Sequence, residues 1–144
     1  MTTMFTRPAR RTMFACALAL TLAVGCKKSE PRCERCGMKL DPQSAWNAEL
    51  VLPSGETKKY DTPRCALQAR TGLEGAVRVQ EFYGKAWSDG KQVRFVPGSD
   101  VLGPMGPDIV PVDPARAGKF VADHGGGPAL PLEAVTPAVI DGLK

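Results

Sequence analysis

The sequence predicts a small α+β fold of two similar strand-rich units, each with one helix. Short apolar segments rich in β-branched and aromatic residues alternate with turn residues, a pattern typical of strands. Two helix starts are indicated by a capping residue followed by proline, at Thr62-Pro63 and Asp113-Pro114. Proline is favoured in the first helical turn because its missing N–H would have no partner there. An apolar content of 43% is ordinary for a globular domain.

A weak internal repeat supports the two-unit interpretation. Gly37-Met38 precedes strands and a proline-started helix that carries Cys65. Met105-Gly106 precedes a strand and a second proline-started helix, which carries His124. The same order of elements therefore occurs twice in the chain.

The first unit is expected to contain a hairpin and a helix. Residues 46–52 are predicted to form a strand, residues 53–55 a turn and residues 57–60 the returning strand. The helix is predicted to begin at Pro63, to continue through about Arg70 and to end before Gly72.

Another strand pair is expected after the first helix. Residues 77–83 and 92–96 are predicted to pair with each other through a turn at residues 87–90. Residues 97–108 are rich in Gly and Pro and are predicted to be a loop. A short strand is expected at residues 109–112.

The end of the chain is predicted to be helical. A helix is expected from Asp113-Pro114 to about His124, where three glycines follow. Thr136-Pro137 repeats the cap-and-proline signal and predicts a final short helix.

The start of the chain is typical of a bacterial lipoprotein. Residues 1–25 have a basic beginning and an apolar run too short to span a bilayer, and they are predicted to be a removable signal peptide. The run ends in a lipobox-like segment before Cys26, the predicted lipidation site. Residues 26–32 are then a lipid-anchored tether and residues 33–144 the folded domain. Lys27 after the cysteine slightly favours the outer membrane.

Charge and motifs exclude two broad classes of function. Of the 19 basic residues, three precede the expected cleavage site, so 16 remain against 15 acidic residues. That balance argues against nucleic-acid binding, which usually needs a basic face. No nucleophile–base arrangement, phosphate-binding loop or paired carboxylates indicate an enzyme.

The segment Cys33-Glu-Arg-Cys36-Gly-Met38 is the strongest functional signal. It places two thiols and a thioether within six positions, and soft sulfur donors select Cu(I) over hard cations. Met105 lies in a second Gly- and Pro-rich stretch, and the only histidine, His124, follows it. We therefore expect a Cu(I) site that draws on these residues and on the third thiol, Cys65.

Other interpretations of the cysteines remain open. The expected mature chain keeps three thiols, Cys33, Cys36 and Cys65. A Cys33–Cys36 disulfide would leave one thiol free. A zinc site could combine the three thiols with His124. A thioredoxin-like pair is disfavoured, since a polar segment and not a strand precedes Cys33.

Several single residues also have purely structural interpretations. Cys65 lies in the first turns of its helix and could be a small buried residue. His124 ends a helix, where a positive charge meets the helix dipole favourably. Asp61 is interpreted as an acid flanking the start of the first helix.

Taken together, these segments resemble the NosL family, the lipoproteins encoded with nitrous-oxide reductase. The likeness runs from about Cys33 to Leu132. The matching pieces are Cys36-Gly37-Met38, Pro42, Tyr60-Asp61 with Cys65, Val96-Pro97-Gly98-Ser99, Gly103-Pro104-Met105-Gly106, Ala117, Phe120 and His124-Gly125-Gly126.

The resemblance implies a membrane-tethered copper-binding protein on the periplasmic side of a bacterial membrane. Such a protein would deliver Cu(I) for assembly of the copper centres of nitrous-oxide reductase, in contact with that enzyme or with its maturation transporter complex. The resemblance carries metal ligation over to Cys36, Met38, Met105 and His124, with Cys33 as an additional thiol. It also implies a small α+β fold of two similar units. The alternative is a lipid-anchored interaction module with a structural disulfide or zinc site.

Overall fold

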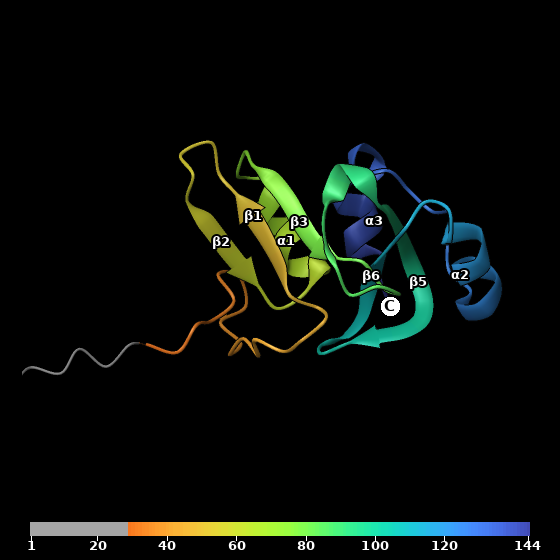
Figure 1. Cartoon of the computed structure of the whole chain (residues 1–144), viewed down its shortest axis with the longest axis horizontal. Helices are drawn as coiled ribbons and strands as arrows, with labels where there is room; N and C mark the ends of the chain where they lie inside the picture. Colours follow the sequence, from red (N-terminus) through yellow and green to blue (C-terminus); the bar gives the residue numbers. More distant parts are fainter. Residues whose placement is uncertain (1–28) are drawn as a thin grey trace, which may run out of the picture.

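The computed structural model describes residues 29–144 (Figure 1). The predicted signal peptide of residues 1–25, the lipidation site Cys26 and the first residues of the tether lie outside the described residues. None of the helices in residues 29–144 combines the length and the apolar character that a membrane-spanning segment requires.

The first sheet has four antiparallel strands in the order β2-β1-β3-β4. Their bounds are β1 Ala48–Val51, β2 Thr57–Tyr60, β3 Ala76–Gln80 and β4 Trp87–Asp89. Alternation of buried and exposed positions gives the sheet one apolar face, where Leu50 of β1 lies opposite Val77 of β3. The predicted hairpin at residues 46–60 is confirmed, with the first strand two residues shorter than expected at its start and one residue shorter at its end.

The second sheet is the antiparallel pair of β5, Arg94–Gly103, and β6, Gly106–Val112. The predicted loop at residues 97–108 is therefore wrong over most of its length. The register shifts between Pro97 and Leu102, and Gly98 adopts a φ of 69° there. The glycines and prolines lie at an irregularity within β5 and at the tight turn between β5 and β6. Both are places where a strand accepts these residue types.

The predicted pairing of residues 77–83 with residues 92–96 is also wrong. β3 pairs with β1 and β4, whereas β5 pairs with β6. The predicted strand ends early because Glu81 begins a turn, in which the Gly84 N–H donates to the Glu81 carboxylate at 2.6 Å. The carboxylate also accepts from the Asp113 N–H at 3.2 Å, which ties this turn to the end of β6.

The helices are α1, Pro63–Arg70, α2, Ala117–His124, and α3, Pro137–Asp141, with short 3₁₀ helices η1, Gly90–Gln92, and η2, Leu132–Ala134. The starts of α1 and α3 are as predicted, since the hydroxyls of Thr62 and Thr136 accept backbone N–H groups. The predicted start of α2 is wrong. Asp113 instead closes a turn by accepting the Ala115 N–H, and the helix begins at Ala117.

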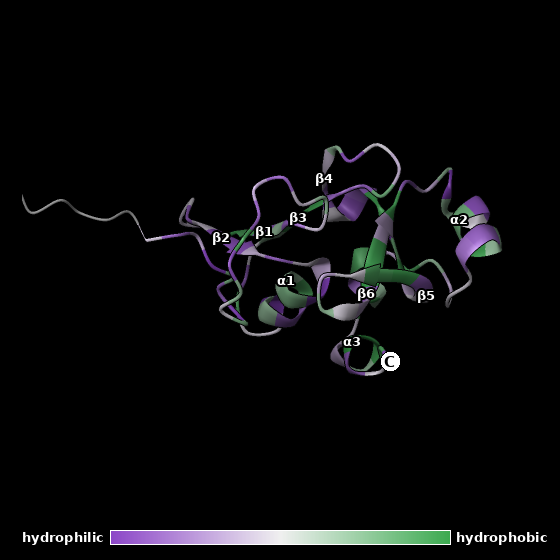
Figure 2. Cartoon of the chain, turned by 90° about the horizontal axis from the view of Figure 1, so that it is seen from below, coloured by the Kyte–Doolittle hydropathy of each residue, from purple (hydrophilic) through white to green (hydrophobic). Residues whose placement is uncertain are grey.

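Two apolar cores result from this arrangement. The larger core lies between the four-stranded sheet, α1 and α3, and includes Leu50, Tyr60 and Ile140. The smaller core joins β5 and β6 to α2 through Phe120. Figure 2 shows hydrophobic colour along much of β6 and the adjoining part of β5, whereas α2 shows both hydrophilic and hydrophobic colour. The α+β class is confirmed, with four strands and α1 in one unit and two strands and α2 in the other.

Helix α1 connects the two units because it contacts both sheets, through β1, β2 and β3 on one side and β6 on the other. Figures 1 and 2 place α2 at the opposite end of the molecule from β2. The N-terminal loop of residues 31–40 lies at the β2 side of α1, where its Glu34 N–H donates to the Lys59 carbonyl at 3.0 Å.

Candidate metal centre

Two cysteines lie in a tight loop ahead of the first sheet. The Cys33 N–H donates to the Met38 carbonyl at 2.8 Å, and the Gly37 N–H donates to the Cys33 carbonyl at 2.9 Å. Gly37 has a φ of 76°, which side-chain-bearing residues rarely adopt. The glycine therefore allows the loop to turn back directly after Cys36.

Two further potential metal ligands, Asp61 and Cys65, lie at the start of α1. Asp61 follows β2 directly, and Cys65 lies in the first turn of the helix. The Thr62 hydroxyl accepts the Cys65 N–H at 3.3 Å, so the helix cap also fixes the backbone that carries the thiol.

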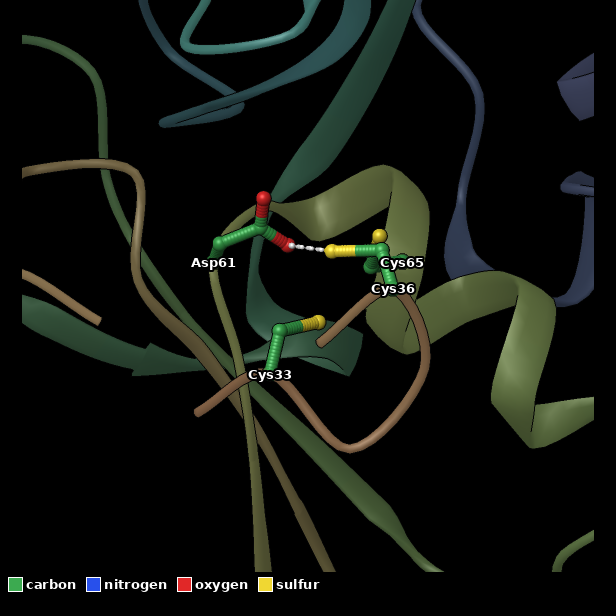
Figure 3. Close-up of side chains that lie close together, drawn as sticks. All are labelled: Cys33, Cys36, Asp61 and Cys65. Carbon is green, nitrogen blue, oxygen red and sulfur yellow. Dashed lines mark hydrogen bonds between the residues drawn. The ribbon is translucent and has the colours of Figure 1, made fainter. Parts of the chain in front are cut away.

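The three thiols and the carboxylate converge on one point. The Sγ atoms of Cys33, Cys36 and Cys65 and a carboxylate oxygen of Asp61 all lie within 4.8 Å of one another. Figure 3 shows Cys33 and Cys36 reaching from the loop toward Cys65 on α1. All three cysteines are free thiols. These three thiols and the Asp61 carboxylate form the one such group of potential metal ligands in residues 29–144.

The cluster is buried on one side and open on the other. Cys33, Asp61 and Cys65 are each at most 5% exposed, whereas Cys36 is exposed. The Cys36 thiol donates to Asp61 Oδ1 at 3.5 Å. Asp61 Oδ2 is buried without a hydrogen-bond partner in the described part of the chain. A buried carboxylate oxygen normally has a partner, so this atom is available to a cation.

The surroundings favour the protonated form of the two buried thiols. Burial raises the pKa of Cys33, although backbone N–H groups of the loop and of Asp61 partly oppose the shift. Burial also raises the pKa of Cys65, and its hydrogen bond to Asp61 raises it further. Both groups are therefore neutral thiols at neutral pH when no metal is bound.

These shifts predict that metal binding releases protons. A metal takes the thiolate form, so each buried thiol that ligates gives up one proton, and affinity for Cu(I) or Zn(II) should rise with pH throughout the range below the raised thiol pKa values. A pH indicator in weakly buffered solution measures the release. Cys65→Ser should remove one proton from the count. Binding without proton release would contradict ligation by these thiols.

A surface cavity opens beside the cluster. Its lining includes Cys36, Cys65 and Met105, together with Arg35, Thr62, Arg64, Gln68 and Asp108. Met105 lies in the turn between β5 and β6 and is 51% exposed. The chain thus brings a thioether from a sequence-distant hairpin to the open side of the thiol cluster.

The hairpin is fastened to α1 next to the site. The Arg64 N–H donates to Asp108 Oδ1 at 2.9 Å, and the Arg64 guanidinium donates to the Pro107 carbonyl at 3.1 Å. Burial raises the pKa of Asp108 to about 6, although N–H groups of Ile109 and Arg64 lower it. These bonds hold β6 against the helix start and so position the turn that carries Met105.

The structure places two of the sequence-predicted residues, Met38 and His124, outside both the thiol cluster and the cavity lining. Met38 is 39% exposed in the cysteine loop, to which its carbonyl contributes a hydrogen bond. His124 lies on α2, where Nδ1 is 3.0 Å from the Asp100 carboxylate and the ring packs against Phe120. The predicted zinc set of three thiols with His124 is therefore not assembled.

From the sequence, Asp61 is interpreted as an acid that flanks the start of α1, and the structure places it there. Its membership of the thiol cluster is not predicted, because the cysteine loop reaches Asp61 only once β2 and the start of α1 are in place. The sequence feature that could have indicated this role is the position of Asp61 directly after a predicted strand and four residues before Cys65.

Comparison with known proteins gives two findings. The family model named NosL matches residues 26–140. The crystal structure of the copper chaperone NosL from Shewanella denitrificans superimposes with a TM-score of 0.65, at 19% sequence identity, over 75% of this chain and 91% of that one. At this identity the likeness establishes a shared fold. No curated protein matches the chain significantly.

Proposed function

Because the chain belongs to the NosL family, as the match over residues 26–140 establishes, we propose that it is a copper chaperone. It binds Cu(I) at the thiol cluster and delivers the metal for maturation of the copper centres of nitrous-oxide reductase. The role is one of metal binding and transfer and not of catalysis.

The observation that carries this proposal is the convergence of three thiols within 4.8 Å beside an exposed thioether. Thiolate and thioether ligands prefer Cu(I) among the common biological cations. We assign Cys33, Cys36 and Cys65 as thiolate ligands and Met105 as the thioether that reaches the open side. Asp61 completes the cluster as a buried anion. The structural relative of this fold is described as a copper chaperone.

Delivery requires that a second protein reach the metal. Cys36 is exposed and Met105 is 51% exposed, so both sulfurs lie where an incoming ligand could approach. Cys33 and Cys65 lie deeper and would retain the ion between encounters. This arrangement, with exposed sulfurs on one side and buried sulfurs on the other, suits a metal carrier. A purely structural metal site is normally closed by its ligands.

The proposed location is the periplasmic face of a bacterial membrane, with Cys26 lipidated. Acyl chains contribute about 0.8 kcal/mol per buried CH₂, so two or more hold a protein firmly. Seven residue steps from Cys26 to Cys33 reach at most about 25 Å, which would keep the metal site near the bilayer. The recipient proposed is nitrous-oxide reductase or its membrane transporter complex.

Zinc is the second candidate metal, favoured by one observation. Asp61 adds an oxygen donor to the three thiols, and four ligands of this kind are compatible with tetrahedral Zn(II). On that alternative the chain would be an anchored interaction module with a structural site, and Met105 would have no role as a ligand.

Anaerobic titration of the purified full chain in mild detergent separates the two metals. Reduced protein is titrated with Cu(I) against a competing chelator and, in parallel, with Zn(II). We expect one Cu(I) to bind tightly, with binding at least about 100-fold tighter than for Zn(II), as the soft donor set demands. Tight Zn(II) with weak Cu(I) would establish the structural site, and binding of neither metal would reject both functions.

A further inference from the structure

The metal cluster is bordered by three arginines that form no ion pair within residues 29–144. The guanidinium of Arg32 donates to the Gly37 carbonyl at 2.9 Å, that of Arg35 to the Gln68 side chain at 2.7 Å and that of Arg64 to the Pro107 carbonyl at 3.1 Å. All three acceptors are neutral. Several other basic residues of the described chain, such as Lys58 and Arg78, do form ion pairs.

Of the acids near these arginines, Asp108 contacts Arg64 itself, and Glu34 is engaged elsewhere. Residues 1–28 contain no Asp or Glu, so the segment before the described residues cannot supply a partner. Asp61 and Asp108 near the cavity are buried. Glu34, the exposed acid of the cysteine loop, lies 3.7 Å from Lys58. Burial raises the pKa of the Asp108 carboxyl, but the charge of Arg64 lowers it and is partly compensated by the carboxylate. Arg35, in contrast, has no carboxylate partner within residues 29–144.

We call the surface formed by Arg35, Cys36, Arg64 and Met105 the metal face. These four residues line one cavity, whereas Arg32 lines another together with Glu30 and Glu34. A copper-accepting group must approach over this surface to reach the exposed sulfurs. The unpaired charge of Arg35 thus lies along the route of transfer.

We propose, on the premise of the copper-chaperone function above, that the metal face is a docking surface for an acidic copper-accepting segment. The partner would carry Asp or Glu side chains around its own methionine or cysteine ligands. Guanidinium groups suit this role because they bind carboxylates through two parallel hydrogen bonds. Opposite charges also accelerate encounter and orient the two surfaces before close contact.

Transfer in the docked pair is a ligand exchange without oxidation or reduction. Each bond from a chain sulfur to Cu(I) is replaced by a bond from an acceptor sulfur. The released thiolates of the chain take up protons, which come from solvent when the acceptor ligand is methionine and from the acceptor thiol when it is cysteine. The exposed sulfurs of Cys36 and Met105 exchange first, and the buried thiols of Cys33 and Cys65 last.

The test compares two synthetic acceptors that differ only in charge. Both peptides carry the same pair of methionines, flanked by aspartates in one and by lysines in the other. The full chain in mild detergent is loaded with Cu(I), and transfer is monitored by anaerobic stopped flow. We expect transfer to the acidic peptide to be about tenfold faster at low ionic strength. The difference should disappear at about 1 M salt, where the screening length is about 3 Å.

Charge reversal localises the effect. Arg35→Glu should reduce the acidic-to-basic rate ratio several-fold, because it inverts one charge beside the cavity. Lys91→Glu is the matched control, since it changes the net charge equally at an exposed position of η1 outside the cavity lining. It should leave the ratio nearly unchanged. Equal effects of the two substitutions, or equal rates for both peptides, would overturn docking at the metal face.

The Cu(I) affinity of each variant, measured without any acceptor, keeps the two proposals distinguishable. If the unaltered chain does not bind Cu(I) tightly, the chaperone function itself is rejected. Tight binding with no charge selectivity would reject only the docking surface. If Arg35→Glu weakens Cu(I) binding and leaves the rate ratio unchanged, the arginine compensates the thiolates and the docking inference is also overturned.

Discussion

We expect Cys36→Ser to lower the Cu(I) affinity of the chain by about 100-fold or more, since loss of even an outer partner of a metal ligand costs about 10- to 100-fold. Cys36 contributes a soft thiolate at the open side of the cluster, and a serine hydroxyl is a hard and weakly acidic donor. The measurement is competition with a Cu(I) chelator under anaerobic conditions.

The exposure of Cys36 makes this variant easy to interpret. Within residues 29–144 its side chain takes part in no apolar core and forms one hydrogen bond, to Asp61, so the thermal stability of the metal-free chain should stay unchanged. Glu34→Gln in the same loop serves as a matched control, because Glu34 is exposed and outside the cluster. Retained affinity in Cys36→Ser, or an equal loss in Glu34→Gln, would remove Cys36 from the ligand set.

Local signals predict the elements that depend on local contacts. The start of α1 requires only that Thr62 cap the helix and that Pro63 occupy its first turn, and both conditions are visible in neighbouring residues. The same signal at Asp113-Pro114 fails for α2. Aspartate followed by proline serves a turn as well as a helix start, and the choice depends on how the next residues pack.

Strand pairing could not be predicted in the same way. Val77 and Val79 alternate with polar residues, which predicts a strand but names no partner. Their partner is β1, because Ala48 and Leu50 lie across from them in the larger core. The Gly- and Pro-rich segment after Val96 predicts a loop, yet a strand irregularity uses the same residue types as a loop does.

The metal centre was predictable only in part, because some of its residues are close in sequence and others are brought together by tertiary contacts. Cys33 and Cys36 are close in sequence, and their spacing alone indicates a shared site. Cys65 and Asp61 join them only because Glu34 bonds to β2 and thereby brings the loop against the start of α1. His124 fits the same sequence pattern as a ligand, but α2 belongs to the smaller core and holds it beside Asp100.

We expect Met105→Leu to lower Cu(I) affinity by about tenfold and to leave Zn(II) affinity unchanged, because thioethers are ligands for Cu(I) and not for zinc. Leucine is close to methionine in volume and apolar character, so the hairpin should fold as before. Chelator competition measures the affinities. X-ray absorption of the loaded chain should register one fewer sulfur around copper.

Met38→Leu is the matched control, because the sequence presents both methionines as equivalent and the structure does not. Met105 lines the cavity with Cys36 and Cys65, whereas Met38 is absent from that lining although it is only two residues from Cys36. Met38→Leu should therefore leave Cu(I) affinity within about twofold of the unaltered chain, the scale of an exposed apolar exchange. The reverse result, with Met38→Leu lowering the affinity and Met105→Leu leaving it intact, would mean that the thioether comes from the cysteine loop. The β5–β6 hairpin would then have no part in holding the metal.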